Sequence, residues 1–256
     1  MSATASVNPV ARAIKAILIV QLGMAVFLFG RDMIGSWSGF GFAPRAPSLD
    51  APVRPGDQTR RFDPRDLPQR DIPDSRPFPA TPNMPDRLAF EIIDVEDGDR
   101  VLTLTGAIAP GDARRLTEFL EPLAEPIKTA FLNSPGGSVS DALQIGTLLR
   151  EAEMNTEMAA GDICMSACPY VLSAGVERRV AEGAFVGVHQ HYFEENTALP
   201  AFLIVEDIQR GQGEVMTYLA EMGVDPLLMQ HALVTPPEAI YVFLREELET
   251  YRIITE

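Results

Sequence analysis

The sequence predicts an α/β domain in its C-terminal part, and three observations support this prediction. Short apolar runs alternate there with segments whose apolar residues recur every three to four positions, a pattern typical of βαβ units with parallel strands. The chain of 256 residues is 46% hydrophobic, which is enough for a sizeable core. The segments before residue 88 differ in composition and do not share the pattern.

The expected elements follow one another from residue 101. Asp112 and the apolar positions after it predict the first helix. Strands are expected at residues 101–106, 127–132, 156–160, 179–181, 185–189, 241–243 and 253–254. Further helices are expected at residues 142–152, 203–222, 226–233 and 245–251.

Two segments precede this domain. Residues 13–30 are apolar except for Lys15 and Gln21 and follow Arg12, which is typical of an uncleaved signal anchor. We predict that residues 1–38 form a membrane anchor or signal segment with one transmembrane helix. The domain then lies in the periplasm, tethered to a bacterial inner membrane, although the basic residues on the two sides of the segment are nearly balanced.

Residues 39–87 are rich in proline, arginine and aspartate and contain few large apolar residues. Such a segment does not bury enough surface to offset its ordering entropy, and prolines favour an extended chain. We therefore predict a Pro-rich disordered linker over 39–87 and a folded domain over 88–256.

The net charge of −15 is unevenly distributed. Residues 1–88 carry 11 basic and 8 acidic side chains, whereas residues 89–256 carry 10 basic and 28 acidic side chains. An acidic domain repels phosphate backbones, so nucleic acid is excluded as a partner, but the charge alone names no other partner.

Ser166 lies at the centre of the segment GDICMSACPYVLSAG, residues 161–175. We expect it between the predicted strand at 156–160 and a short apolar run at 169–174, at the N-terminus of a helix. Free N–H groups and the helix dipole there stabilise an oxyanion beside a nucleophilic serine. The alternative is a serine that only caps the helix.

The two cysteines of the chain, Cys164 and Cys168, flank this serine. Three states remain open for them: packed free thiols, a disulfide formed in an oxidising compartment, or a metal site. A tetrahedral zinc site would require two further ligands nearby. We predict no metal and no cofactor.

Two further motifs belong to the same region. NSPGGSV, residues 133–139, places Gly136 and Gly137 between a strand and a helix, where backbone N–H groups can closely approach a ligand. His189 ends the strand at 185–189, at the edge of an α/β sheet where sites collect. His191 is a competitor for the same role, and His231 lies in the later helical region.

Together these motifs resemble the Clp protease and crotonase superfamily, closest to membrane-anchored Clp-like serine peptidases of the periplasm. The resemblance rests on NSPGGSV, on SACPYVLSAG at 166–175, on Arg178 and Arg179, on GVHQ at 187–190 and on LREELETYRII at 244–254. It implies repeated ββα units with a helical insertion, and a homo-oligomer whose contacts we expect at the helix over 203–222.

The resemblance also implies roles for individual residues. Ser166 is the nucleophile, His189 is its general base, and Gly136, Gly137 and Ala167 form the oxyanion hole. The family has an aspartate before the terminal strand, but the alignment of LREEL places Ile240 there. Glu238 is the candidate third member, with a Ser–His dyad or an inactive relative as alternatives.

The expected function is ATP-independent hydrolysis of peptides or unfolded protein segments by a membrane-tethered serine peptidase. A lysine base is excluded, because Lys15 and Lys128 are the only lysines and neither is suitably placed. The alternative from another class is a catalytically inactive, membrane-tethered binding or scaffold protein. Acyl-CoA chemistry is disfavoured, because the acidic domain offers few lysines for phosphate.

Overall fold

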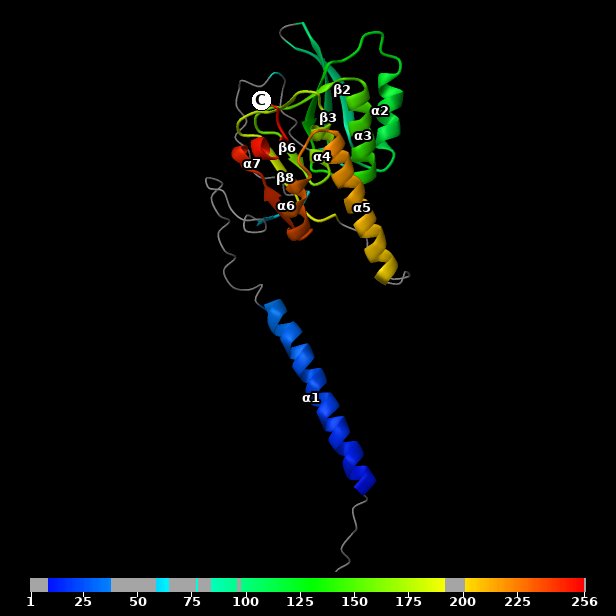
Figure 1. The fold of residues 1–256 in the computed structure, drawn as a ribbon, viewed down its shortest axis with the longest axis vertical. Coiled ribbons are helices and arrows are strands. Elements are labelled where there is room, and N and C mark those ends of the chain that lie inside the picture. Colours follow the sequence, from blue (N-terminus) through cyan, green and yellow to red (C-terminus); the bar gives the residue numbers. More distant parts are fainter. Residues whose placement is uncertain are drawn as a thin grey trace, which may run out of the picture. The chain divides into compact units, whose positions relative to one another are not determined.

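The structure is a computed structural model that describes residues 9–37, 59–64, 77, 84–95, 98–191 and 201–255. It divides into two units, Met1–Arg45 and Ala46–Glu256. The first unit contains helix α1 (Pro9–Trp37), and the second contains all the other described elements (Figure 1).

Helix α1 is largely aliphatic, and Ile17, Leu18 and Ile19 on it are more than half exposed. Within the described part of the chain, no helix has both the length and the apolar character needed to cross a membrane. The predicted membrane anchor stays a prediction.

Unit 2 contains a five-stranded sheet in the order β2-β3-β4-β5-β7. Strands β3, β4, β5 and β7 are parallel, and β2 is antiparallel to β3. Helix α2 connects β3 to β4, and α3 connects β4 to β5. The bounds are β2 (Ala89–Asp94), β3 (Arg100–Thr105), α2 (Asp112–Leu120), β4 (Thr129–Asn133), α3 (Val139–Glu151), β5 (Asn155–Met158) and β7 (Arg178–Val180).

A second, four-stranded sheet has the order β1-β9-β8-β6. Strands β6 and β8 are parallel, whereas β9 is antiparallel to both β8 and β1. The mixed α/β class is therefore observed, with antiparallel strands that the predicted parallel pairing lacked. The bounds are β1 (Thr59–Arg61), β6 (Ile163–Met165), β8 (Phe185–Val188) and β9 (Ala239–Val242).

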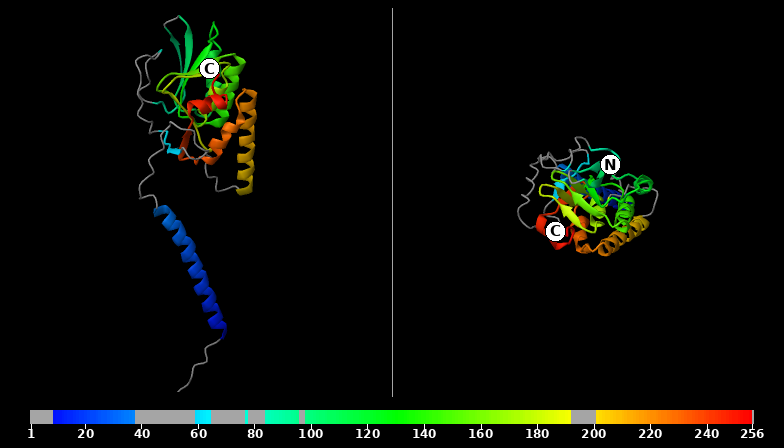
Figure 2. Two further views of the ribbon diagram at one scale, coloured as in Figure 1. Left: turned by 60° about the vertical axis from the view of Figure 1, so that its left-hand side comes forward. Right: turned by 90° about the horizontal axis from the view of Figure 1, so that it is seen from above.

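Helix α4 (Cys168–Ser173) is buried at every position and is separated from the end of β6 by two residues. A bridge between Ser134 and Cys164 joins the end of β4 to β6, so the two sheets meet beside this helix. The remaining helices are α5 (Ala201–Glu221), the 3-10 helix η2 (Pro226–Leu228), α6 (Met229–Val234) and α7 (Arg245–Thr250). Figure 2 shows α5 as a long helix along one side of unit 2.

Two predictions about the chain's course are wrong. Part of the predicted linker is structured: residues 59–61 form β1 and pair with β9, and Pro85 accepts a hydrogen bond from the Ala107 N–H. Edge pairing uses backbone groups and requires few apolar side chains, so composition did not indicate it. Residues 253–254 do not form a strand; they are buried after α7, next to Thr255, whose N–H donates to the Arg178 carbonyl.

Candidate active site

Ser166 occupies a sharp turn between β6 and α4. Its φ of 60° lies in the left-handed region, and its N–H donates to the Gly187 carbonyl at 2.9 Å. A non-glycine residue in this conformation is uncommon and is found mainly where the surrounding structure enforces it. The preceding strand is β6 rather than the predicted strand at 156–160, which corresponds to β5 and ends at Met158.

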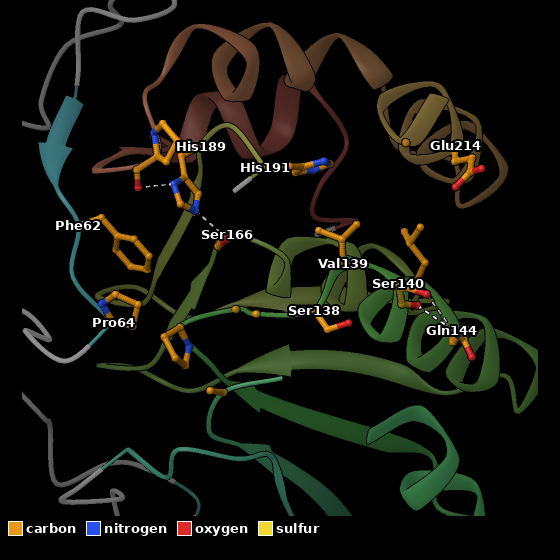
Figure 3. Close-up of a pocket in the computed structure, with 17 residues that line it drawn as sticks. Phe62, Pro64, Ser138, Val139, Ser140, Gln144, Ser166, His189, His191 and Glu214 are labelled. Carbon is orange, nitrogen blue, oxygen red and sulfur yellow. Dashed lines mark hydrogen bonds between the residues drawn. The ribbon is translucent and has the colours of Figure 1, made fainter. Parts of the chain in front are cut away.

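His189 directly follows β8 and faces this serine. Strands β6 and β8 are parallel with Met165 opposite Gly187, so both residues leave the same edge of the sheet. The His189 Nε2 atom lies 2.7 Å from the Ser166 Oγ atom, which is hydrogen-bond distance (Figure 3). The structure thus brings together the two residues expected as nucleophile and base.

The other ring nitrogen of His189 identifies its tautomer. Nδ1 lies 2.8 Å from the carbonyl oxygen of Pro237. A carbonyl oxygen only accepts hydrogen bonds, so Nδ1 carries the proton and donates it to this bond. In the neutral ring, Nε2 then has a lone pair that accepts the hydroxyl proton of Ser166, which is the orientation that a general base requires.

Glu238 does not take the place expected for the third member of the triad. Its side chain is exposed, and its backbone carbonyl accepts a hydrogen bond from the Phe62 N–H at 2.9 Å. The preceding carbonyl, that of Pro237, faces the imidazole instead. A neutral carbonyl orients the ring as a carboxylate would, but it stabilises the imidazolium less.

Burial lowers the pKa of His189, and the hydrogen bond to Pro237 opposes this effect without cancelling it. The ring is therefore neutral at neutral pH. The edge-to-face contact with Phe62, at 5.2 Å between ring centroids, places an apolar side chain against the imidazole. Phe62 follows β1, so a segment far upstream in the sequence lines the site.

The other two histidines have different environments. His191 lines the same cavity, but its Nε2 lies 2.8 Å from the Tyr170 hydroxyl. Burial and the neighbouring His189 lower the pKa of His191. His231 is buried against Tyr241 and bonds the Tyr251 hydroxyl through Nε2 at 2.9 Å. Only His189 among the three histidines is hydrogen-bonded to Ser166.

The residues expected at the oxyanion hole also lie together. A Cβ atom at Gly136 would lie 2.6 Å from the Ser166 Cβ and 2.8 Å from the Ala167 N, so the diglycine backbone abuts the nucleophile turn. The Gly136 N–H donates to the Ser134 hydroxyl at 3.1 Å. Within the described residues, no hydrogen bond occupies the N–H of Gly137 or of Ala167, which leaves these two as the available donors.

Cys164 and Cys168 are joined by a disulfide. Both cysteines are buried, one in β6 and the other at the first position of α4. The bond connects the two elements that enter and leave the Ser166 turn. Of the three states that the sequence left open, the structure contains the disulfide.

A cavity of about 880 Å³ opens beside Ser166 and His189 (Figure 3). Its size is in the range of sites for small molecules and peptide side chains. Many of its lining residues are ordinary in type and were not predicted, because only the fold brings them here; among them are Phe62, Pro64, Gly211, Glu214 and Pro237. The one sequence signal that could have indicated a structural role for Phe62 is that it is a large aromatic residue in an otherwise polar segment.

No known protein-family model matches the chain, and no curated protein matches its sequence. Over the described residues, no group of three or more His, Cys, Asp or Glu side chains is arranged to hold a metal ion.

Proposed function

We propose that this protein is an ATP-independent serine peptidase that cleaves peptides or unfolded protein segments. The observation that carries the proposal is the chain of two hydrogen bonds from Ser166 Oγ to His189 Nε2, and from His189 Nδ1 to the Pro237 carbonyl. This chain orients a neutral imidazole as the base for an activated hydroxyl. Packing alone does not require such an arrangement at the edge of an open cavity.

Acylation begins when His189 Nε2 removes the Ser166 hydroxyl proton. The Oγ atom forms a bond to the carbonyl carbon of the substrate, and the carbonyl oxygen becomes an oxyanion stabilised by the N–H groups of Gly137 and Ala167. The imidazolium then donates its proton to the leaving nitrogen, and the C–N bond breaks. The products are an acyl ester on Ser166 and a free amine.

Deacylation repeats these steps with water. His189 removes a proton from water, the resulting hydroxide attacks the ester carbon, and the C–O bond to Ser166 breaks as the serine regains the proton. The carboxylic acid product leaves, and the site returns to its initial state. Every proton transfer uses one ring atom, Nε2, while Nδ1 stays bonded to Pro237.

The same proposal includes the Clp/crotonase-type fold, a homo-oligomer and a membrane tether in the periplasm. The strand–Gly136–Gly137–helix turn and the Ser166 turn support the resemblance on which these features rest. The exposed aliphatic side chains of α1 support a role in membrane attachment. Peptides or already unfolded segments are the proposed substrates, since a periplasmic domain has no ATP-driven partner to unfold proteins.

The proposal is tested by hydrolysis of casein, an unfolded polypeptide, with the purified full-length protein in detergent. We expect new N-termini to appear, and we expect Ser166→Ala and His189→Ala to lower the rate by on the order of a thousandfold or more. Arg179→Met, a substitution of a partly exposed residue outside the cavity lining, is the control and should retain the wild-type rate.

Hydrolysis that persists in Ser166→Ala would identify a contaminating protease and contradict the proposal. Absence of hydrolysis in a folded wild-type protein, together with binding of casein, would favour the inactive binding or scaffold protein. The observation that favours this second candidate is the neutral carbonyl of Pro237 in the position of a catalytic carboxylate.

A further inference from the structure

The cavity extends well beyond the reacting groups. On the side away from Phe62 it runs between the first turns of α3 and the middle of α5. Figure 3 shows His191 and Glu214 across the cavity from Val139, Ser140 and Gln144. We call this half the α3–α5 pocket and define it by Val139, Leu143, Gly211 and Glu214.

Two features make the pocket suitable for a long aliphatic stem. Val139 and Leu143 are half-buried, pack on the core and present apolar surface to the cavity. Opposite them, Gly211 contributes no side chain, and a Cβ atom there would meet nothing within 4 Å. Glycine inside a helix costs about 1 kcal/mol relative to alanine, so this cavity-lining position lacks a side chain at a cost in helix stability.

The electrostatic character of the pocket is negative. Glu214 is exposed and is the acidic side chain among the described residues that line the cavity, which include no lysine or arginine. His189 and His191 also line it, and both are neutral at neutral pH because their pKa values are lowered. Residues 89–256 carry 28 acidic and 10 basic side chains, so the domain as a whole attracts cations.

We propose that the α3–α5 pocket receives a lysine or arginine side chain of the polypeptide substrate, with its methylene stem on Val139 and Leu143 and its cation at Glu214. Lysine and arginine combine these two properties, since their stems pack on apolar surface while their charged ends remain in water. The inference rests on the proposed peptidase function, because it names the substrate that the same site selects. Gly211 and Glu214 are then specificity-determining residues.

The test uses two peptidyl diphenyl phosphonates that differ only in the residue bearing phosphorus, a lysine or a norleucine analogue. Both form a bond between Ser166 Oγ and phosphorus with loss of phenolate, and the serine proton goes to His189. In the full-length wild-type protein, we expect the lysine probe to react about two- to fivefold faster than the norleucine probe, as an exposed ion pair allows.

The variants separate charge from shape. Glu214→Gln should abolish the preference, and Glu214→Lys should reverse it. Glu221→Gln changes an exposed acidic residue of the same helix outside the cavity and should keep the preference. Gly211→Leu should slow both probes more than tenfold. Gly213→Leu, whose Cβ also meets open space but does not line the cavity, should stay within twofold of wild type.

A small alkyl fluorophosphonate, which needs no side-chain pocket, distinguishes two kinds of failure. If it labels Ser166 in all variants but the wild type shows no preference for lysine, or Glu214→Gln keeps that preference, the inference is overturned and the peptidase proposal stands. If it does not label the folded wild-type protein, the proposed function fails, and the inference fails with it.

Discussion

At the scale of single residues, the chemistry depends on the protonation of His189. Only the neutral ring accepts the Ser166 proton, and burial lowers the pKa of this ring below its usual value of 6.5. The rate of serine labelling should therefore fall as the pH drops through the lowered pKa, with a midpoint below about 6.5.

The measurement is the rate of fluorophosphonate labelling against pH, with circular dichroism at each pH to separate protonation from unfolding. A midpoint above about 6.5 would contradict this prediction, because a raised pKa requires a group that stabilises the imidazolium. Glu238→Gln should leave the midpoint pH unchanged and keep the labelling rate within twofold of wild type, since the Glu238 carboxylate does not face the ring.

Gly136 is the residue whose replacement should damage the site most selectively. Its φ is 94°, and a Cβ atom there would lie 2.6 Å from the Ser166 Cβ and 2.8 Å from the Ala167 N. We expect Gly136→Ala to lower the labelling rate at least about a hundredfold, because the added atom blocks an oxyanion donor.

The matched control is Gly183→Ala. This glycine has a φ of 80° and open space around the position of a Cβ atom. The control should cost about 1 to 2 kcal/mol of stability through its backbone conformation alone and keep the labelling rate. Equal rates in the two alanine variants would contradict the proposed position of the oxyanion hole.

Sequence motifs predicted Ser166, His189 and the glycines because each role requires a particular residue type. The hydrogen-bond acceptor at Pro237 could not be predicted in this way, because every residue has a backbone carbonyl and only the fold determines which one faces His189. The prediction of Glu238 failed for the same reason. It assumed that the third group is a side chain.

At the scale of elements, the disulfide fixes the ends of β6 and α4 around the nucleophile. It closes a very short loop, so the entropic model predicts a modest stabilisation of about 2 kcal/mol. The double variant Cys164→Ala/Cys168→Ala should lose about this free energy of unfolding in urea titrations, and its Ser166 should react more slowly with the fluorophosphonate.

The disulfide should also resist reduction in the native protein. Both cysteines are buried, so dithiothreitol should reduce the disulfide only after the protein unfolds. Rapid reduction without unfolding would contradict this assignment.

Arg178 joins β7 to the C-terminal segment. Its buried guanidinium donates hydrogen bonds to the carbonyls of Gly175, Arg252 and Ile253 at 2.9 to 3.1 Å. Arg178→Met would remove the donor to the Arg252 and Ile253 carbonyls, whereas the Gly175 carbonyl keeps its hydrogen bond from Arg150, and the change should cost about 3 kcal/mol in chemical denaturation.

The neighbouring Arg179→Met is the control for this variant. Arg179 makes partly exposed ion pairs with Glu157 and Glu177, and their loss should cost less than about 1 kcal/mol. A similar loss of stability in both variants would contradict the role of Arg178 as the link between β7 and the end of the chain.

Hydrophobic periodicity predicted most of the longer elements in unit 2, because long helices and buried strands have clear patterns. It missed three strands: β2, β6, which has three residues inside a segment of mixed polarity, and β1, whose contribution to the sheet is its backbone. Of these, β1 and β6 border the site, through Phe62 and Ser166. The residues of the candidate site were therefore easier to predict from the sequence than the elements that hold them.

At the scale of the whole molecule, the folded unit begins well before the boundary predicted at residue 88. Unit 2 starts at Ala46 and includes β1 and Phe62. Arg87 also belongs to it, through a 2.7 Å hydrogen bond from its Nε to the buried Asp112. A chain of residues 46–256 should melt and label as the full-length protein does.

A chain of residues 89–256 should be less stable and label more slowly, because it lacks the strand beside β9 and the aromatic cover of His189. Thermal unfolding and fluorophosphonate labelling of the two shortened chains provide the comparison. If the two shortened chains have equal melting temperatures and labelling rates, residues 59–64 contribute nothing to the site. Phe62→Ala in the full-length protein then tests the aromatic contact alone.

Covalent labelling shows whether His189 activates Ser166 as a nucleophile. The full-length protein is treated with a fluorophosphonate, and mass spectrometry locates the adduct. We predict a single adduct on Ser166 that is absent in Ser166→Ala and strongly reduced in His189→Ala. Absence of an adduct in a folded wild-type protein, or equal labelling of the Ser166→Ala variant, would show that Ser166 is not an activated nucleophile.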